Sequence, residues 1–184
     1  MNFALWIPIG AVIIIALFVW SLYNSLVTAR VRIREAWSGI DVQLKRRADL
    51  IPNLIEAVKG YVKHEKTVLE NVTKARTAAL NAKSVGQKEQ ADNMLTGALK
   101  TLFAVSENYP KLQASANFKQ LQEELSDVEE KIAYSRQFYN SNVMDFNTKI
   151  QIFPNNLIAG NFGFKRQEFF EADQSERENV KVKF

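Results

Sequence analysis

The chain has 184 residues, of which 47% are hydrophobic and 24% are charged, which is the composition of about one globular domain. Cysteine is absent, so disulfides, thiol nucleophiles and thiolate metal sites are excluded. The formal net charge of +4 is modest and does not by itself indicate a nucleic-acid-binding protein. Seven glycines and four prolines are few for an all-β protein, which needs many turns.

The first charged side chain is Arg30, and an apolar run from Phe3 to Tyr23 precedes it. About 20 apolar residues at about 1.5 Å each cross a hydrocarbon core of about 30 Å, and aromatic residues stand at both ends of this run. A cleaved signal peptide is the alternative, because the small residues 27–29 resemble a cleavage site. However, no basic residue precedes the run, and it is longer than the roughly 7–15 residues of a signal-peptide core. The sequence therefore predicts an uncleaved transmembrane anchor over residues 1–29.

Three arginines, Arg30, Arg32 and Arg34, follow the anchor directly and are placed to contact lipid headgroups at the membrane surface. On the other side of the membrane they face only the α-amino group of the chain. Because cationic residues are retained on the cytoplasmic side, we expect the N-terminus outside and the bulk of the chain in the cytoplasm. Membrane lipid is thus the first partner that the sequence predicts.

Beyond the anchor, apolar residues recur every three or four positions in four successive segments. The first segment continues the membrane helix to about residue 44. The second spans about residues 55–81 and the third about residues 91–109, with a polar loop expected around Gly86 between them. The fourth is a coiled-coil-like seam on a helix of about 40 residues, formed by Phe118, Leu121, Leu125, Val128, Ile132, Ser135, Tyr139, Phe146, Ile150 and Phe153. Such stripes can be buried only against one another. We therefore predict an all-α fold, with an antiparallel bundle of about four helices over residues 30–153.

A proline at position 52 interrupts the charged stretch "LKRRADLIP", which occupies residues 44–52. A proline disfavours helical geometry in the preceding residue and removes a backbone donor. The sequence therefore predicts a break or kink over residues 48–53. Asp49 would then cap the helix that starts after the break, with Pro52 in its first turn.

The cations of this stretch have two interpretations. In the first, they lie on a solvated helix end and form local ion pairs, for example with Asp41. In the second, Arg46 or Arg47 turns inward and binds a backbone carbonyl or a carboxylate of the fourth helix, for which Glu123 and Glu124 are the candidates. We favour the second interpretation as the sharper prediction.

The sequence offers no catalytic or metal-binding constellation. His64 is the only histidine, and a zinc site without cysteine would need several carboxylates around it. The acid pairs at 123–124 and 129–130 lack the Glu-x-x-His spacing of di-iron bundles, and "GNFGF" at 160–164 lacks the context of a phosphate loop. Asn142 is either a polar residue that fixes the register of the seam or, as we favour, a solvated one. We expect no catalytic residue, no cofactor and no small-molecule substrate.

Residues 154–184 lose the helical periodicity and are predicted to form an irregular phenylalanine-rich segment followed by a mobile charged tail. Phenylalanines at this density, including Phe162 and Phe164, are expected to be covered. They either fold back over the bundle, enter the membrane surface beside Lys165 and Arg166, or contact a second copy. Several helices also carry apolar residues beside their main stripe, namely Leu99, Phe103, Val143 and Met144. We therefore predict a homo-oligomer with this segment as a contact.

Three blocks of the sequence are similar to the LemA family of bacterial membrane proteins. They are "YNSLVTARVRIREAWSGIDVQLKRRADLIPNLIEAVKGYVKHE", "NFKQLQEELSDVEEKIAYSRQFYN" and "FNTKIQIFPNNLIAGNFGFK", and with a terminal "FFEA" they occur in order at fitting distances. The resemblance implies a bacterial inner-membrane protein with a bundle of long helices, and it implies no established activity. We interpret the motif positions as structural or interface residues: Trp37, Asp41, Arg46, Arg47, Asp49, Pro52, Asn53, His64, Glu65 and Asn140.

Three functions remain open at this point. The first, which we favour, is a non-catalytic membrane-anchored scaffold or adaptor that presents a helical surface to other envelope proteins. The second is a membrane-bound enzyme that uses His64 and carboxylates. The third is a regulatory partner of a membrane protease or transporter, which the sequence does not separate from the first.

Overall fold

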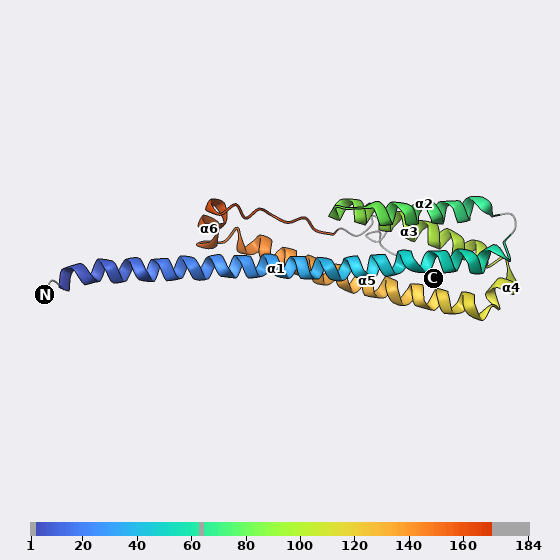
Figure 1. Cartoon of the computed structure of the whole chain (residues 1–184), viewed down its shortest axis with the longest axis horizontal. Coiled ribbons are helices and arrows are strands. Elements are labelled where there is room, and N and C mark those ends of the chain that lie inside the picture. Colours follow the sequence, from blue (N-terminus) through green and yellow to red (C-terminus); the bar gives the residue numbers. More distant parts are fainter. Residues whose placement is uncertain (1–2, 63–64, 171–184) are drawn as a thin grey trace, which may run out of the picture. The chain divides into compact units, whose positions relative to one another are not determined.

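The computed structural model describes residues 3–62 and 65–170, which form helices and no strand. The helices are α1 (Phe3–Lys59), α2 (Lys66–Asn81), α3 (Val85–Ser106), α4 (Pro110–Gln113), α5 (Ala116–Lys149) and α6 (Asn155–Asn161) (Figure 1). The all-α prediction is confirmed. So is the prediction that the apolar N-terminal helix continues into the following segment, because α1 runs through residue 29 without interruption. The domain boundaries after residues 29 and 153 stay predictions.

The chain divides into two compact units. Among the described residues, 3–38 and 138–168 form the first unit, so it contains the N-terminal part of α1, the end of α5, and α6. Residues 39–62, 65–137, 169 and 170 form the second unit. The second unit therefore contains the remainder of α1, all of α2, α3 and α4, and the first two thirds of α5.

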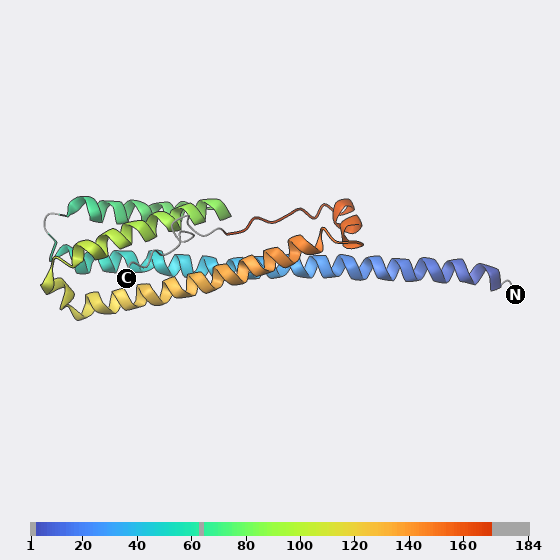
Figure 2. The ribbon, with the colours of Figure 1, turned by 180° about the vertical axis from the view of Figure 1, so that it is seen from behind.

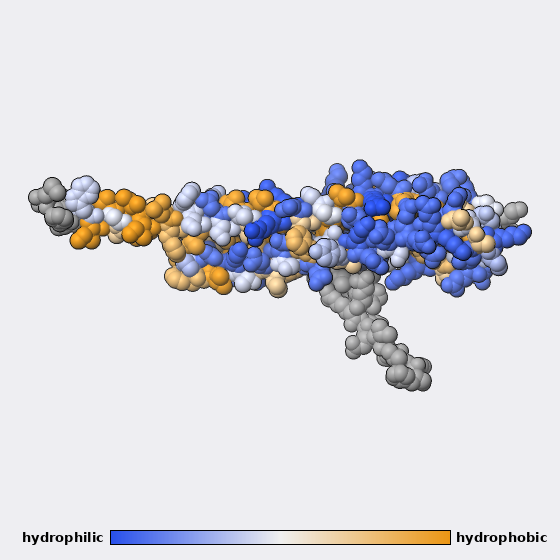
Figure 3. All heavy atoms as spheres, turned by 90° about the horizontal axis from the view of Figure 1, so that it is seen from below, coloured by the Kyte–Doolittle hydropathy of each residue, from blue (hydrophilic) through white to orange (hydrophobic). Residues whose placement is uncertain are grey.

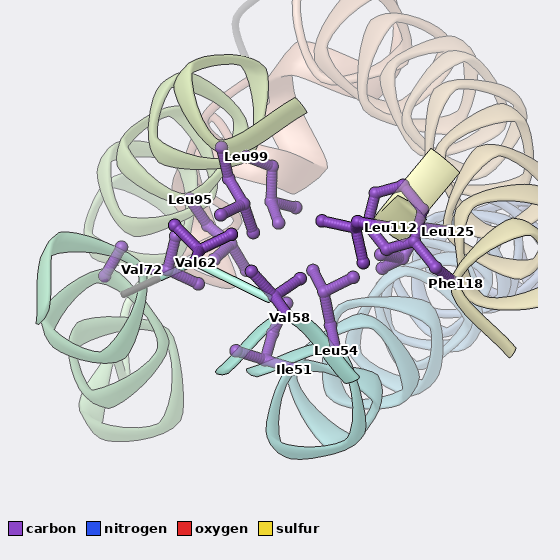
Figure 4. Packing of buried hydrophobic residues seen from close by; sticks show 12 residues of the cluster. Ile51, Leu54, Val58, Val62, Val72, Leu95, Leu99, Leu112, Phe118 and Leu125 are labelled. Carbon is purple, nitrogen blue, oxygen red and sulfur yellow. The ribbon is translucent and has the colours of Figure 1, made fainter. Parts of the chain in front are cut away.

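The core of the second unit is built from the predicted stripes. Helix α1 contributes one face, α2 and α3 form a hairpin, and α4 and α5 close the remaining side (Figure 4). The buried apolar side chains of this cluster are Ile51, Leu54, Val58, Val62, Val72, Ala75, Leu95, Leu99, Leu102, Leu112, Phe118 and Leu125. Leu99, which the sequence placed beside the main stripe of its helix, is thus fully part of the core of its own chain.

Helix α3 begins earlier than the periodicity predicted. The residues around Gly86 were expected to form a loop, but the helix starts at Val85 because Ser84 caps it. The Ser84 hydroxyl accepts a bond of 3.2 Å from the Gln87 N–H, and the Gln87 side chain accepts a bond of 3.4 Å from the Ser84 N–H. This reciprocal capping box satisfies N–H groups that would otherwise lack partners at the helix start.

The predicted break at residues 48–53 is wrong. Helix α1 continues through Pro52 and ends only at Lys59, and Asp49 lies inside it rather than at an N-cap. Proline at position 52 removes the donor that would bond the carbonyl of Ala48, four residues earlier. In the structure that carbonyl accepts a bond of 2.9 Å from Nε of Arg76, a side chain of α2. A tertiary hydrogen bond thus replaces the lost helical one, and the helix ends instead at Lys59, after which the chain turns at residues 60–61.

In the first unit, the buried side of α1 and the end of α5 hold α6 and the segment after it. Asn147 of α5 binds the backbone of Gln167 in both directions, because its amide donates to the Gln167 carbonyl and its oxygen accepts from the Gln167 N–H, each at 2.9 Å. The hydroxyl of Tyr139 donates to the carbonyl of Glu168 at 2.9 Å. The segment that follows α6 is therefore fixed to α5 by side chains rather than by regular secondary structure.

Three details of this unit correct the sequence interpretation. A short helix, α6, lies within the region predicted to be irregular. Phe153, assigned to the seam, is 78% exposed. Val143 occupies the buried position on the seam, whereas Asn142 is half-buried and donates to the carbonyl of Phe138 on its own helix, so it fixes no register.

Candidate functional site

The most distinctive polar feature of the second unit is a partly buried network of charges formed by Arg47, Asp92, Glu129 and Arg136, in which the side chain of Glu129 is 40% exposed. Arg47 lies on the inner face of α1 and is only 4% exposed. One of its terminal nitrogens binds Asp92 of α3 at 2.7 Å and Thr96 at 2.9 Å, and the other lies 2.6 Å from a carboxylate oxygen of Glu129 on α5. A single side chain therefore connects three helices. We call these four residues the arginine network.

Asp92 is the second centre of the arginine network. It is 2% exposed, and its second carboxylate oxygen accepts from Arg136 of α5. The guanidinium of Arg136 also lies over the ring of Phe170, 4.7 Å from its centroid. Two arginines and two carboxylates sum to no net charge, which is the arrangement that makes buried charge tolerable.

Around the arginine network the same stretch of α1 makes two further contacts. Arg76 of α2 binds the Ala48 carbonyl, as described above, and Lys88 of α3 forms an ion pair with Asp41. Burial lowers the pKa of Lys88 below its ordinary value. Residues 41–48 of α1 are therefore the strip against which α2, α3 and α5 are aligned.

A pocket of about 310 Å³ opens beside the network. Arg47, Thr96 and Glu129 form its polar side, and Leu99, Phe103 and Leu125 are among its apolar lining. Nε of Arg47 and Nε of Arg136 are buried without a hydrogen-bond partner within the described part of the chain. The arginine network thus retains two buried donors without a partner, and one of these two arginines, Arg47, also lines the hollow.

The structure supports the interpretation that an arginine turns inward, and it identifies which one. Arg47 is buried, whereas Arg46 and Asp49 are exposed. The expected partners were wrong, because the carboxylates that bind Arg47 are Asp92 and Glu129 rather than Glu123 and Glu124.

None of the other predicted interface residues is part of the arginine network. In the first unit, the rings of Trp37 and Tyr139 pack in a tilted arrangement with centroids 5.5 Å apart, and Asn140 is half-buried. In the second unit Pro52 and Asn53 are exposed, and Glu65 occupies the N-cap of α2 without a side-chain cap bond. His64 lies outside the described residues.

Phe162 and Phe164 belong to an aromatic cluster of the first unit. Phe164 is 8% exposed and contacts Tyr23 and Phe146, with centroid distances of 5.8 and 6.3 Å. The guanidinium of Arg30 lies 5.0 Å from the centroid of Phe164. Arg32 and Arg34 are exposed. Of the three arginines assigned to the membrane surface, Arg30 thus also contributes to packing.

Sequence reasoning missed Asp92, Glu129, Arg136 and Asn147. A signal was present for Asp92, which lies three residues before Leu95 and seven before Leu99 and therefore on the buried face of α3. Arg136 likewise lies four residues after Ile132 on the seam of α5. A charged residue in phase with a buried stripe indicates a buried partner of opposite sign.

The arginine network has the chemistry of structural ion pairs. Both oxygens of Asp92 are occupied by guanidinium groups, and arginine does not release its proton at ordinary pH. No three potential ligands gather into a metal-binding group within residues 3–62 and 65–170. Burial, with the Glu168 carboxylate as a second cause, raises the pKa of Tyr139, so its hydroxyl stays a hydrogen-bond donor.

Comparison with known proteins gives consistent matches. The model of the LemA family matches residues 36–184. Protein LemA of Metamycoplasma hominis is 30% identical over 162 residues, which covers 85% of this chain and 72% of that protein. Magnetosome protein MamQ 2 of Paramagnetospirillum magneticum is 27% identical over 175 residues (81% of this chain), and magnetosome protein MamQ of Magnetospirillum gryphiswaldense is 26% identical over 174 residues (80% of this chain). The chain spans 64% of the length of each MamQ protein, and none of these names is that of an enzyme.

Proposed function

Since the chain belongs to the LemA family, we propose that it is a membrane-anchored helical scaffold or adaptor of the bacterial envelope, without catalytic activity of its own. In this role the second unit presents its outer helical faces to other envelope proteins and to further copies of the chain. The observation that carries the proposal is the construction of α1. One uninterrupted helix contains both the exposed apolar residues of a candidate span and the buried residues that hold the second unit together.

The anchoring part of the proposal rests on the N-terminal part of α1. It is long and apolar enough to cross a membrane, and its apolar window is not buried by the rest of the chain. Figure 3 shows the hydrophobic residues gathered over this end of α1. We place the span in the inner membrane with the N-terminus outside, because Arg30, Arg32 and Arg34 follow it and Lys165 and Arg166 of the same unit add two exposed cations.

The scaffold part rests on the arginine network. Arg47 fixes the phase of α1 against α3 and α5 within the second unit, so the helical faces that this unit exposes are held in one arrangement. A charge-balanced, mostly buried set of ion pairs is suited to specify such an arrangement of helices. The arrangement therefore favours presentation of a surface over chemistry.

Crosslinking in cells followed by affinity purification of the full chain from its native membranes tests the proposal. A membrane protein, or a second copy, is expected to be recovered with the wild type and with Arg46→Ala. Recovery is expected to fall with Arg47→Ala, because this variant disturbs the alignment of the helices. Equal recovery with both variants, or no partner at all, would contradict the proposal.

Metal analysis of the purified chain separates the scaffold from the enzyme that uses His64. Zinc or iron bound in stoichiometric amount would favour the enzyme. A membrane protease or transporter among the recovered proteins would instead specify what the adaptor serves.

A further inference from the structure

The exposed apolar part of α1 ends where α6 begins to cover it. Apart from Val19, the large apolar side chains from Trp6 to Trp20 are more than half exposed, whereas Leu26 is fully buried. Between them, the ring of Tyr23 lies 5.0 Å from the ring of Phe162 and 5.8 Å from that of Phe164. Within the first unit, α6 and the residues after it therefore lie beside α1 at the level of Tyr23 (Figure 2).

If the candidate span crosses the membrane as proposed above, that level coincides with the edge of the hydrocarbon core. Residues 3–22 of α1 rise about 30 Å at about 1.5 Å per residue, which equals the thickness of a hydrocarbon core. Tyr23 then lies at the boundary between acyl chains and headgroups, where tyrosine is enriched. Because α6 is held at Tyr23, it lies at the same depth.

The segment around α6 exposes a group of large apolar side chains at this depth. Ile152 is 50% exposed, Phe153 78%, and Leu157 and Phe162 56% each. We call these four residues the α6 patch. Exposed apolar side chains gathered in one short segment indicate an interaction surface rather than ordinary scatter.

Cations border the α6 patch. Lys165 and Arg166 are exposed, and a terminal nitrogen of Arg166 donates to the side chain of Gln151 at 2.7 Å, next to the patch. Arg30 is held above Phe164, on the cytoplasmic side of Tyr23 along α1 in the orientation proposed above. An apolar surface with a cationic border is the pattern of segments that lie in a membrane interface.

From this geometry we propose that the α6 patch inserts into the surface of the leaflet through which α1 passes, so that the chain contacts the membrane twice. The apolar side chains enter the boundary between headgroups and acyl chains, and Lys165 and Arg166 contact lipid phosphates. Lipid is the occupant because the patch is continuous with the candidate span and fixed at the depth where that span leaves the hydrocarbon core. The contact would hold α1 at a defined tilt and rotation relative to the membrane.

Nitroxide labelling of the full chain tests this insertion, since the natural sequence has no cysteine to compete for the label. Leu157→Cys places the label in the α6 patch. Met144→Cys is the matched control, because Met144 lies in the same unit and is 59% exposed, but is not part of the patch. Both labelled chains are placed in phosphatidylcholine vesicles, with and without phosphatidylglycerol, and circular dichroism verifies that each is folded.

For the nitroxide at position 157 we expect a higher collision rate with oxygen than with a water-soluble nickel chelate. For the nitroxide at position 144 we expect the reverse. Phosphatidylglycerol should increase the difference at 157, and Phe153→Ser should reduce it. Equal access of the nickel chelate at both positions would overturn the proposal. Spin–spin broadening at 157 that disappears when unlabelled chain is added would overturn it as well, because a second copy would then cover the patch.

Discussion

Arg46 and Arg47 are neighbours on α1 with the same charge, and they differ in burial. Only Arg47 is enclosed, with its guanidinium bonded to Asp92 and close to Glu129. Arg47→Ala leaves a buried aspartate with one of its two cations, so we expect the free energy of unfolding to fall by about 3–5 kcal/mol. Arg46→Ala, the matched control, should change it by about 0.5 kcal/mol or less. Urea unfolding of the detergent-solubilised chain, followed by circular dichroism, measures both.

The pairing can be tested separately from the loss of one charge. If Arg47 and Asp92 stabilise each other, then adding Asp92→Ala to Arg47→Ala should cost less than Asp92→Ala costs alone. Additive effects would contradict the contact. Arg136 keeps Asp92 partly compensated in the single variant, so the coupling measured in this cycle is a lower bound on the pair.

Tyr139 gives the first unit a stability that depends on alkaline pH. Burial, and secondarily the carboxylate of Glu168, raise its pKa above the unfolded value near 10. Its contribution is therefore complete below about pH 10 and is lost as the pH rises through the raised folded pKa. Tyr139→Phe removes the hydroxyl that donates to the Glu168 carbonyl, so the free energy of unfolding should fall by about 0.5–1.5 kcal/mol at neutral pH.

Tyr139→Phe should also lose less of its free energy of unfolding than the wild type does when the pH is raised above about 10. Urea unfolding of both chains at neutral and alkaline pH gives this difference. Identical alkaline profiles would contradict the assignment to Tyr139.

At the residue level, the sequence predicted an inward-facing arginine and did not identify its contacts. The predicted stripe of the first segment was followed only to about residue 44, just before the expected break at residues 48–53, so it was not used to distinguish Arg46 from Arg47. The partners were missed because Asp92 was placed at the start of a helix whose first residues had been assigned to a loop. Ion pairs between distant segments follow from tertiary packing, which local patterns do not encode.

Among the elements, the passage of α1 through Pro52 depends on α2. The carbonyl of Ala48, a residue that is 1% exposed, has Arg76 as the donor that replaces the missing backbone N–H. Arg76→Met should therefore leave a buried carbonyl unpaired and lower the free energy of unfolding by about 1–3 kcal/mol. In the background of Pro52→Ala, which restores the backbone donor, the same substitution should cost markedly less. Thermal unfolding of the four chains gives the coupling energy, and an equal cost in both backgrounds would refute this role of Arg76.

The long helices could be predicted from the sequence. The short helix α6, and the continuity of α1 through Pro52, which depends on a contact with another helix, could not. The seam from Phe118 to Ile150 was correct at most positions because burial along a long helix repeats its period many times. Helix α6 has too few residues to show a period. The uninterrupted α1 required knowledge of Arg76, which lies 24 positions further along the chain than Pro52.

For the whole molecule, the first property to be tested is the orientation of the span in the membrane. Cysteine substituted for Met94, which is 51% exposed in the second unit, should react with a membrane-impermeant maleimide only after cells are lysed. Cysteine at position 2 should react in intact cells, because three arginines hold the other end of the span inside. The opposite labelling pattern would reverse the proposed topology.

Self-association is the second property to be tested, and the structure reduces the set of side chains that are able to form a contact between copies. Leu99 and Val143, which the sequence left beside the main stripes, are buried within the chain. A truncation that removes residues 153–184 cannot test this contact by itself, because it would also delete Phe164 and Phe170, which are buried within the chain. We therefore look for the contact between copies among the exposed side chains of the helices.

Tyr134 and Phe138 are the best candidates for that contact. They lie four residues apart on α5, so they share one face, and they are 73% and 52% exposed. Confinement to a membrane raises the effective concentration of such faces, and closed symmetry is the usual outcome for identical chains. We expect light scattering of the detergent-solubilised chain to give an oligomeric mass that falls toward the monomer when both residues are changed to serine. An unchanged mass would exclude this face, and a monomeric wild type at micromolar concentration would contradict self-association.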